Sequence, residues 1–250
     1  MGWLALTEEC REAAEGRMPE PETGPDGRRA KRPQRMQVFA NPFVERWLAQ
    51  AHPITPGLLF GWVVALGLYR GVVDFGLAGV GLFCAGVLAT SLIEYSLHRF
   101  AFHYDAKSPA GRLRVFLMHG YHHEFMDDPM RLVLPPIAIV PIALVIALVW
   151  YLVLGPYWLP VFGGTAAGYV AYDWSHYYTH YFQPKRGVGR WLKRYHMLHH
   201  HDSPNHRYGI TSPLWDVVFG TYLPLDRMVR RAGKHGLPTV APTGETAETS

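Results

Sequence analysis

The chain has few cysteines, two among 250 residues, and this scarcity excludes several kinds of site. Cys10 lies in a polar stretch and Cys84 in an apolar one, so we expect no disulfide, and two distant thiols cannot hold an iron–sulfur cluster. The sequence also lacks a Gly-x-Gly-x-x-Gly dinucleotide loop and the His-Pro-Gly-Gly haem motif. Its formal net charge of +4 is not gathered into a compact basic motif, so we expect no nucleic-acid partner.

Charge is missing from three long stretches, which are residues 53–69, 75–93 and 132–172. A membrane span needs about 20 apolar residues, so the last stretch is long enough for two spans that turn at Gly155-Pro156. Arg70 and Asp74 separate the first two stretches and mark a hairpin tip. The pattern predicts an all-α integral membrane protein with four transmembrane helices in two hairpins and a cytoplasmic helical cap.

The cations are distributed unevenly along the chain. Of 24 Lys and Arg residues, 23 lie in residues 1–52, 94–131 and 173–250, which four spans place on one side. Arg70 falls on the opposite side. Because cytoplasmic loops carry the excess of Lys and Arg, we expect a multi-pass protein with both termini and its polar segments in the cytoplasm.

Polar segments at the two ends of the chain flank a single predicted membrane domain. Residues 11–35 are rich in Glu, Arg, Pro and Gly, a composition typical of disorder. We therefore expect a disordered N-terminal tail over residues 1–36, a membrane domain over 37–228 and a disordered C-terminal tail over 229–250. Within the domain, residues 38–50 have the composition of a short interfacial helix.

Ten of the 14 histidines fall in four short clusters. They are His98 and His103; His119, His122 and His123; His176 and His180; and His196, His199 and His200. All ten lie in or beside the segments that Lys and Arg place in the cytoplasm. Chance does not produce such a pattern, so we predict that these ten are metal ligands. His52, His201, His206 and His235 receive no ligand role.

Helical geometry predicts how the clustered side chains face. His196, His199 and His200 are spaced at i, i+3 and i+4 and share one helix face. His98 and His103 do not, because five residues turn an α-helix by about 500° and leave these side chains roughly 140° apart. Either the helix breaks between them, or they reach different metals.

Ten imidazoles are too many for one ion. Two six-coordinate ions offer twelve positions, which leaves about two open for oxygen or water. Imidazole suits iron, zinc, copper and nickel alike, so the donor set does not select the metal. Glu94 and Asp173 are candidates to form hydrogen bonds with the ring nitrogens of His98 and His176 that do not bind metal. The alternative is that both carboxylates face lipid headgroups.

With these motifs in view, residues 38–225 resemble the fatty acid hydroxylase superfamily of histidine-rich membrane di-iron enzymes, and fatty acid 2-hydroxylases most of all. The matching motifs are His98-Arg-Phe-Ala-Phe-His103, His119-Gly-Tyr-His-His123, His176-Tyr-Tyr-Thr-His180, His196-Met-Leu-His-His200 and the stretch Tyr208–Thr221. The resemblance implies that the ten histidines hold two iron ions, which zinc replaces on purification. It implies O₂-dependent hydroxylation of a lipid acyl chain at C2, with no catalytic residue beyond the metal ligands.

Members from eukaryotes usually carry an N-terminal cytochrome b5 domain, and the residues before the first apolar stretch are too few for one. We therefore expect a separate electron donor, a ferredoxin or cytochrome b5 with its reductase. Candidate docking residues lie beside two of the histidine clusters: Arg112, Arg114, Arg186, Arg190, Lys193 and Arg194. Their alternative role is to bind lipid headgroups.

Two other interpretations stay open. A sterol desaturase or carotenoid hydroxylase of the same superfamily would use the same ligands on a different substrate. A zinc-binding structural membrane protein would hold redox-inert zinc and consume no oxygen.

Overall fold

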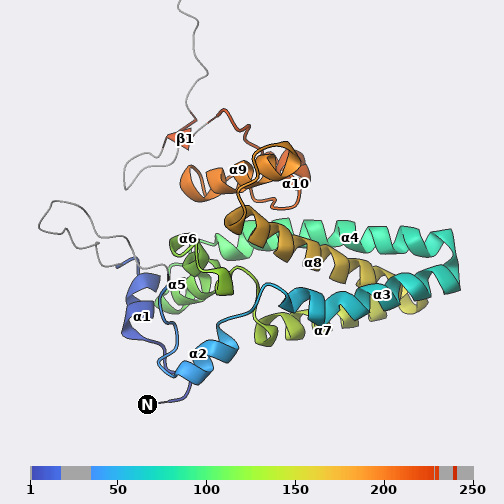
Figure 1. Ribbon diagram of the computed structural model, residues 1–250, viewed down its shortest axis with the longest axis horizontal. Helices are drawn as coiled ribbons and strands as arrows, with labels where there is room; N and C mark the ends of the chain where they lie inside the picture. The colour runs from blue at the N-terminus through green and yellow to red at the C-terminus, as the bar shows by residue number, and fades with distance from the viewer. Residues whose placement is uncertain (1, 18–34, 228, 231–238, 241–250) are drawn as a thin grey trace, which may run out of the picture.

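Four long helices run side by side through most of the molecule (Figure 1). The structure is a computed structural model that describes residues 2–17, 35–227, 229–230 and 239–240. The long helices are α3 (Thr55–Phe75), α4 (Leu77–Leu97), α7 (Pro136–Leu154) and α8 (Trp158–Tyr181). Helix α8 packs against all three of the others, and its two most extensive contacts are with α4 and α3.

Glycines set the spacing between α8 and its neighbours. A Cβ atom added to Gly164 would lie 1.9 Å from the carbonyl oxygen of Phe83 in α4. One added to Gly163 would lie 2.7 Å from the Cα atom of Gly67 in α3. No side chain fits at either point, and small residues of this kind let apolar helices approach closely. The packing therefore aligns the ends of α4 and α8, where two histidine clusters begin.

Among the described residues, three helical segments are long and apolar enough to cross a membrane: Thr55–Phe75, Leu77–Phe102 and Pro129–Tyr181. The third segment contains both α7 and α8, which are joined by the 3-10 turn η4 (Gly155–Tyr157). The expected turn at Gly155-Pro156 is therefore present, and Gly155 has the positive φ of 53° that suits glycine.

The predicted position of the first hairpin tip, at Arg70 and Asp74, is wrong. Helix α3 continues to Phe75, and the chain turns at Gly76, which has a φ of 59°. Arg70 and Asp74 lie four residues apart within the helix and form an ion pair of 2.9 Å. The two charges satisfy each other on one helix face, so they do not end the helix.

Shorter helices gather at the end of the bundle where α4 and α8 finish (Figure 1). They are η1 (His98–Phe102), α5 (Pro109–Val115), η2 (Phe116–Gly120), α6 (Tyr121–Glu124), η3 (Pro129–Arg131), α9 (Gly187–His201) and α10 (Leu214–Val218). Both η1 and η2 are π-helical turns, and η3 is a 3-10 turn. This group of short helices contains or adjoins every clustered histidine.

The N-terminal residues differ from the expected disordered tail. Residues Glu8–Ala14 form α1, and the Thr7 hydroxyl caps the helix by accepting a hydrogen bond from the Cys10 N–H (3.1 Å). Cys10 and Ala13, three residues apart, are buried on one face of α1. They pack in an apolar cluster that includes Phe116 of η2. A stretch that is polar on average thus still forms a helix with one apolar face. Residues 18–34 of the expected tail lie outside the described residues.

Helix α2 (Pro42–Leu48) lies within the expected interfacial helix at 38–50. The Asn41 side chain caps it, and Phe43 and Trp47 are each 62% exposed. At the other end of the chain, β1 (Val229–Arg230) pairs antiparallel with β2 (Thr239–Val240). The rest of the expected tail over 229–250 lies outside the described residues.

Candidate metal centre

The ten clustered histidines converge into two groups of five. The first, named here the His98 group, contains His98, His103, His119, His123 and His199. The second, the His122 group, contains His122, His176, His180, His196 and His200. Within each group the candidate ligand atoms all lie within 4.8 Å of one another. The groups adjoin, since the ring centroids of His123 and His200 are 4.2 Å apart.

A π-helical turn brings His98 and His103 into the same group. The backbone N–H of His103 donates to the carbonyl of His98 (3.2 Å), an i→i+5 bond that widens the turn η1. Five residues then complete little more than one turn, so the side chains share a face. The expectation of a helix break or of different metals is therefore replaced by a third arrangement, a continuous but wider helix.

Each His-x-x-His-His motif divides its histidines between the two groups. His119 and His123 enter the His98 group, whereas His122 enters the His122 group. The motif on α9 does the reverse, because His196 and His200 enter the His122 group and His199 the His98 group. The i and i+4 side chains thus point to one group and the i+3 side chain to the other, so α6 and α9 both bridge the two groups.

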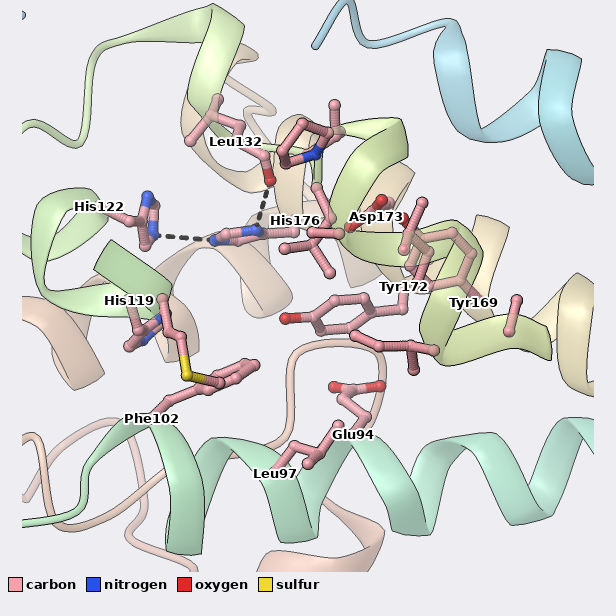
Figure 2. A pocket seen from close by; sticks show the side chains of 18 of the residues that line it. Glu94, Leu97, Phe102, His119, His122, Leu132, Tyr169, Tyr172, Asp173 and His176 are labelled. Carbon is pink, nitrogen blue, oxygen red and sulfur yellow. Dashed lines mark hydrogen bonds between the residues drawn. The ribbon is translucent and has the colours of Figure 1, made fainter. Parts of the chain in front are cut away.

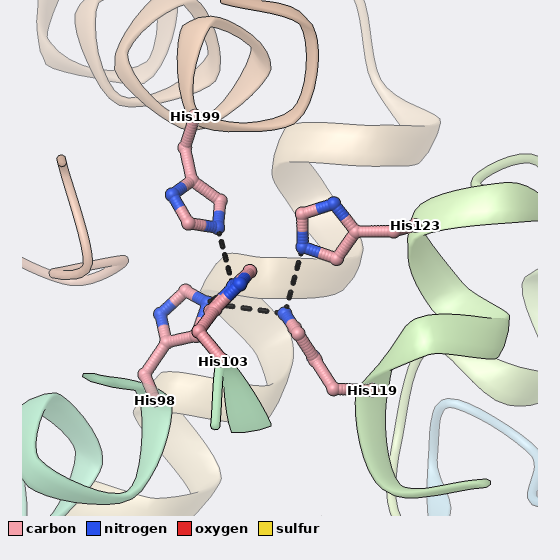
Figure 3. Close-up of side chains that lie close together, drawn as sticks. All are labelled: His98, His103, His119, His123 and His199. Carbon is pink, nitrogen blue, oxygen red and sulfur yellow. Dashed lines mark hydrogen bonds between the residues drawn. The ribbon is translucent and has the colours of Figure 1, made fainter. Parts of the chain in front are cut away.

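The ring atoms of the His98 group have the spacing of ligands around one ion (Figure 3). Its Nε2–Nε2 distances are 3.1 Å for His98 and His119, 3.2 Å for His98 and His103, 2.9 Å for His119 and His123, and 3.0 Å for His103 and His199. Imidazole nitrogens lie about 2.1 Å from a bound metal, so two at right angles are about 3.0 Å apart.

The His122 group repeats this spacing. Its Nε2–Nε2 distances are 2.9 Å for His122 and His176, 3.0 Å for His122 and His200, 2.8 Å for His180 and His196, and 3.0 Å for His196 and His200. Two similar five-nitrogen sites therefore lie next to each other.

Carbonyl partners determine which ring nitrogen carries the proton. Nδ1 of His98 lies 2.5 Å from the carbonyl oxygen of Tyr208, and Nδ1 of His199 lies 2.8 Å from that of His206. A carbonyl can only accept, so Nδ1 donates and the neutral ring keeps its lone pair on Nε2. Lone pairs that converge within 3.2 Å of neighbouring nitrogens repel one another unless a cation lies between them. The donor set thus fits a metal ion.

Burial keeps the rings in the neutral form that metals require. Burial, together with the neighbouring histidines, lowers the pKa of His103 to about 2 and that of His123 to about 3. The same two causes, burial first, hold the pKa of five other rings well below the usual 6.5: His119, His122, His196, His199 and His200. At neutral pH these seven imidazoles need not lose protons to bind metal.

The two candidate carboxylates do not have the expected contacts. The Tyr208 carbonyl, and not Glu94, receives the outer nitrogen of His98. Glu94 instead accepts hydrogen bonds from the Ile210 N–H (2.8 Å) and the Thr211 hydroxyl (3.1 Å). The outer nitrogen of His176 lies 3.1 Å from the Leu132 carbonyl. The hydrogen-bond partners of these two rings are therefore backbone carbonyls from distant segments, and not the carboxylates on the same helices that helical spacing predicted.

A cavity of about 510 Å³ extends from the histidines between α4, α7 and α8. His119, His122 and His176 lie at one end, and Ile146 and Phe162 are among the apolar residues farther along the bundle. Figure 2 shows the Tyr172 hydroxyl pointing into the space beside the histidines, with Glu94 nearby. The cavity is therefore mostly apolar, with a few polar groups at its histidine end.

Several residues of the site were missed by the sequence analysis. Tyr172 reaches the cavity from α8, and its spacing of four residues before His176 was a usable signal. The carbonyls of Leu132, His206 and Tyr208 carried no signal, because any residue has a carbonyl. His201 is exposed, and His206 contributes its backbone oxygen to His199.

Comparisons with known proteins agree with this geometry. Residues 83–221 match the family model described as fatty acid hydroxylase. The dihydroceramide fatty acyl 2-hydroxylase FAH2 of Arabidopsis thaliana is 44% identical over 144 residues, 57% of this chain and 61% of that protein. The ceramide very long chain fatty acid hydroxylase SCS7 of Saccharomyces cerevisiae is 41% identical over 155 residues, 59% of this chain and 40% of that protein.

A solved structure has a similar fold. It is described as full-length scs7p with only the hydroxylase domain visible, and it superimposes with a TM-score of 0.70 at 34% identity. The match covers 76% of this chain and 74% of that chain. The sequence alignments cover only part of the curated relatives, 61% of FAH2 and 40% of SCS7, so the matched part of this chain spans less than two thirds of either protein.

Proposed function

The chain belongs to the fatty acid hydroxylase family, and from this membership we propose that it hydroxylates the acyl chain of a membrane lipid at C2, using O₂. The observation that carries the proposal is the pair of five-histidine groups at the end of an apolar cavity. The names of the similar proteins, fatty acyl 2-hydroxylase and ceramide fatty acid hydroxylase, support the same reaction.

We propose one iron ion in each histidine group. The His98 group would hold one ion and the His122 group the other, each through five Nε2 atoms, so that a six-coordinate ion keeps one position free. Bound iron would supply the O₂ activation that an unactivated C–H bond requires, since such a bond offers nothing to acid–base catalysis. Zinc fits the same nitrogens, so it is expected to replace iron during purification.

The cavity would bind the acyl chain. Its lining on α8 runs from His176 to Phe162, which is about 21 Å at about 1.5 Å per residue. One leaflet of an ordinary bilayer is about 15 Å of hydrocarbon, half of about 30 Å, so the cavity suits a long chain. Tyr172 and Glu94 lie beside the histidines, where the polar end of the lipid would be placed.

We propose four membrane spans, α3, α4, α7 and α8, with the histidines on the cytoplasmic side. The support is that α7 and α8 are separate helices within the long third apolar segment. The positive-inside rule supports the orientation, because 23 of the 24 Lys and Arg residues then lie on the cytoplasmic side. Exposed Phe43 and Trp47 on α2 would lie in the lipid headgroup region of that side.

Electrons would come from a separate acidic carrier such as a ferredoxin or cytochrome b5, with its reductase. Each hydroxylation inserts one oxygen atom into a C–H bond and reduces the other to water, so two electrons and two protons must be delivered. Arg186, Arg190 and Arg194 are exposed around α9 and can steer such a carrier. Arg190 and Arg194 each donate to one backbone carbonyl, of Lys185 (3.0 Å) and Leu225 (3.3 Å) respectively. Lys193 is less exposed than these arginines, and its ammonium donates to the Thr179 and His180 carbonyls at the end of α8.

Lipid mass spectrometry of cells with and without the gene tests the function. We expect a gain of 16 mass units, one oxygen, on sphingolipid or fatty acyl species, located at C2 by fragmentation, and no gain with His199→Ala. New oxygenated sterols or carotenoids would instead assign the chain to another reaction of the superfamily. Bound zinc with no oxygen consumption would show that the protein has a structural role.

A further inference from the structure

The two histidine groups differ in how the outer nitrogens of their rings are supported. In the His98 group, two rings donate to carbonyls: His98 to Tyr208 (2.5 Å) and His199 to His206 (2.8 Å). Both carbonyls belong to one stretch of backbone, residues 202–227, named here the 202–227 segment. An outer hydrogen bond of this kind fixes the tautomer and orientation of a ligand before the metal arrives.

The His122 group has less of this support. Within the described part of the chain, Nδ1 of His122, His196 and His200 are buried without a hydrogen-bond partner. When Nε2 binds an ion, Nδ1 must carry the proton, so three buried N–H groups are left without an acceptor. Each is an unmade hydrogen bond that opposes metal binding. His176 does have an acceptor for its outer nitrogen, the Leu132 carbonyl at 3.1 Å. In the His98 group two rings have a carbonyl acceptor, and among the described residues no Nδ1 atom of that group is buried without a partner.

Arg207 holds the two supporting carbonyls in place. It lies between His206 and Tyr208 in the sequence, and its backbone has a positive φ of 62°, unusual for a residue with a side chain. The guanidinium is fully buried. It donates to the Asp202 carboxylate (2.9 Å) and to three carbonyls at the end of the segment, those of Leu223, Pro224 and Arg227. These bonds maintain the turn that directs the His206 and Tyr208 carbonyls to the His98 group.

Two carboxylates hold the backbone of the 202–227 segment, one from within the segment and one from α4. Asp216 accepts from the N–H groups of Tyr208 (2.9 Å) and Gly209 (2.8 Å). Glu94 accepts from the Ile210 N–H and the Thr211 hydroxyl. Because Glu94 lies on α4, one turn before His98, the same helix that supplies a ligand also holds the segment that orients it.

We infer that the two groups bind metal unequally, with the His98 group the tighter site and the 202–227 segment its positioning element. The inference rests on the proposed function in one respect, that both groups bind a metal ion. Arg207, Asp216 and Glu94 are then positioning residues, which act on the ligands through backbone carbonyls.

Zinc alone is a suitable probe of the two affinities. Purified full-length protein is loaded with zinc, equilibrated with a graded series of chelators and analysed for zinc per chain. We expect two steps, with the first ion lost at least tenfold more readily than the second. His180→Ala, in the His122 group, should remove the weak step, and His103→Ala, the similarly half-buried histidine of the His98 group, should weaken the tight one.

Variants of the segment test its role separately. Asp216→Asn should weaken the tight step about 10- to 100-fold and leave the weak step unchanged. If Asp216→Asn does not fold, Thr211→Val removes a single hydroxyl bond to Glu94 and should give a smaller shift in the same direction. Thr90→Val is the matched control, since its hydroxyl bonds to the Thr165 carbonyl (2.9 Å), away from the segment, and both steps should stay in place.

The outcomes separate the inference from the proposed function. If the protein binds no zinc in either group, the proposed function fails. If two ions bind and leave together, or if the tight ion is the one lost in His180→Ala, only the inference fails. Equal shifts of both steps in Asp216→Asn would show that the segment supports the whole fold and not one site.

Discussion

At the scale of single residues, His200 and His201 are neighbours in the sequence with opposite surroundings. His200 is 7% exposed and its Nε2 lies 3.0 Å from that of His196, whereas His201 is exposed at the end of α9. Burial and convergence, rather than the presence of an imidazole, are the features that mark His200 as a proposed ligand and leave His201 without that role.

Substitution of one proposed ligand should therefore abolish activity, while substitution of His201 should not. We expect His122→Ala and His199→Ala each to reduce hydroxylation at least 100-fold and to lower the metal content. His201→Ala is the control and should keep both. The measurements are hydroxylated product and metal per chain; full activity in either ligand variant would contradict the assignment of both groups.

Buried neutral histidines also make the metal-free protein sensitive to acid. The unfolded rings titrate near 6.5, whereas folding lowers the pKa of His103 to about 2 and that of His123 to about 3. Below pH 6.5 the unfolded chain thus binds more protons than the folded one. Each such ring then removes up to about 1.4 kcal/mol of stability per pH unit, until the pH reaches its folded pKa.

The expected result is a thermal midpoint of the chelator-treated protein that is steady above pH 7 and falls steeply from pH 6.5 to 5. The metal-loaded protein should hold its midpoint to a lower pH, because the ion competes with protons for Nε2. Circular dichroism melts at several pH values provide the measurement. A metal-free midpoint that does not change between pH 7 and 5 would show that these rings are not buried as neutral groups.

At the scale of elements, the π-helical turn η1 decides where His103 points. Five residues separate it from His98, and an ordinary α-helix would turn the side chains apart. The wider i→i+5 turn brings them together, as seen in Figure 3. Such turns are rare and are frequently found at functional sites.

A change in the length of this turn tests its role. Insertion of one Ala after Phe100 separates the two histidines by six residues and should rotate His103 out of the His98 group. We expect one ion per chain in place of two, with the His122 group still loaded, and loss of hydroxylation. Deletion of Ala101 is the matched control, because a spacing of four leaves the rings about 40° apart on an α-helix. The deletion should retain more metal; equal metal in both variants would contradict the prediction.

At the scale of the whole molecule, the short helices α6 and α9, which carry histidines of both groups, lie toward one end of the long helices (Figure 1). Lys and Arg are concentrated at this same end, while Arg70 lies toward the far end of α3. The proposed orientation in the membrane and the proposed docking of an electron carrier both rest on this asymmetry.

Reporter fusions test the orientation. A reporter fused after Ser250 should read as cytoplasmic, and one inserted between Gly155 and Pro156 should read as lying on the other side, because η4 joins two spans. A reporter at Ser250 that reads as periplasmic or lumenal would overturn the topology.

Turnover should depend on an added carrier. We expect no product from purified enzyme with lipid, O₂ and NAD(P)H until a reductase and an acidic carrier are supplied. Reversal of Arg186 and Arg190 to Glu should slow carrier-limited turnover several-fold, as raised salt also should. Lys193 is left intact because it is half-buried and its ammonium donates to two carbonyls at the end of α8, and Arg70→Gln is the control at the opposite end. Turnover by the enzyme alone would disprove an external donor; unchanged carrier kinetics would disprove only this docking site.

The sequence by itself determined the family, the apolar segments and the set of ten histidines. These depend on local features: an uncharged run has the length of a span wherever it occurs, and a His-x-x-His-His motif presents its rings according to helical spacing alone. Local reasoning also located the turn at Gly155-Pro156, where glycine adopts a positive φ.

Only the tertiary structure decided how those residues are used. The division of each motif between two groups brings together helices far apart in the sequence, and the Tyr208 carbonyl that orients His98 comes from 110 residues away. The wider turn at His98 and the His206 carbonyl act over only five and seven residues, but no side-chain pattern predicts either. The buried face of α1 likewise has meaning only once Phe116 packs against it. Backbone carbonyls are the same in every residue, so their roles as partners arise from the packing of distant segments and not from the identity of the side chains.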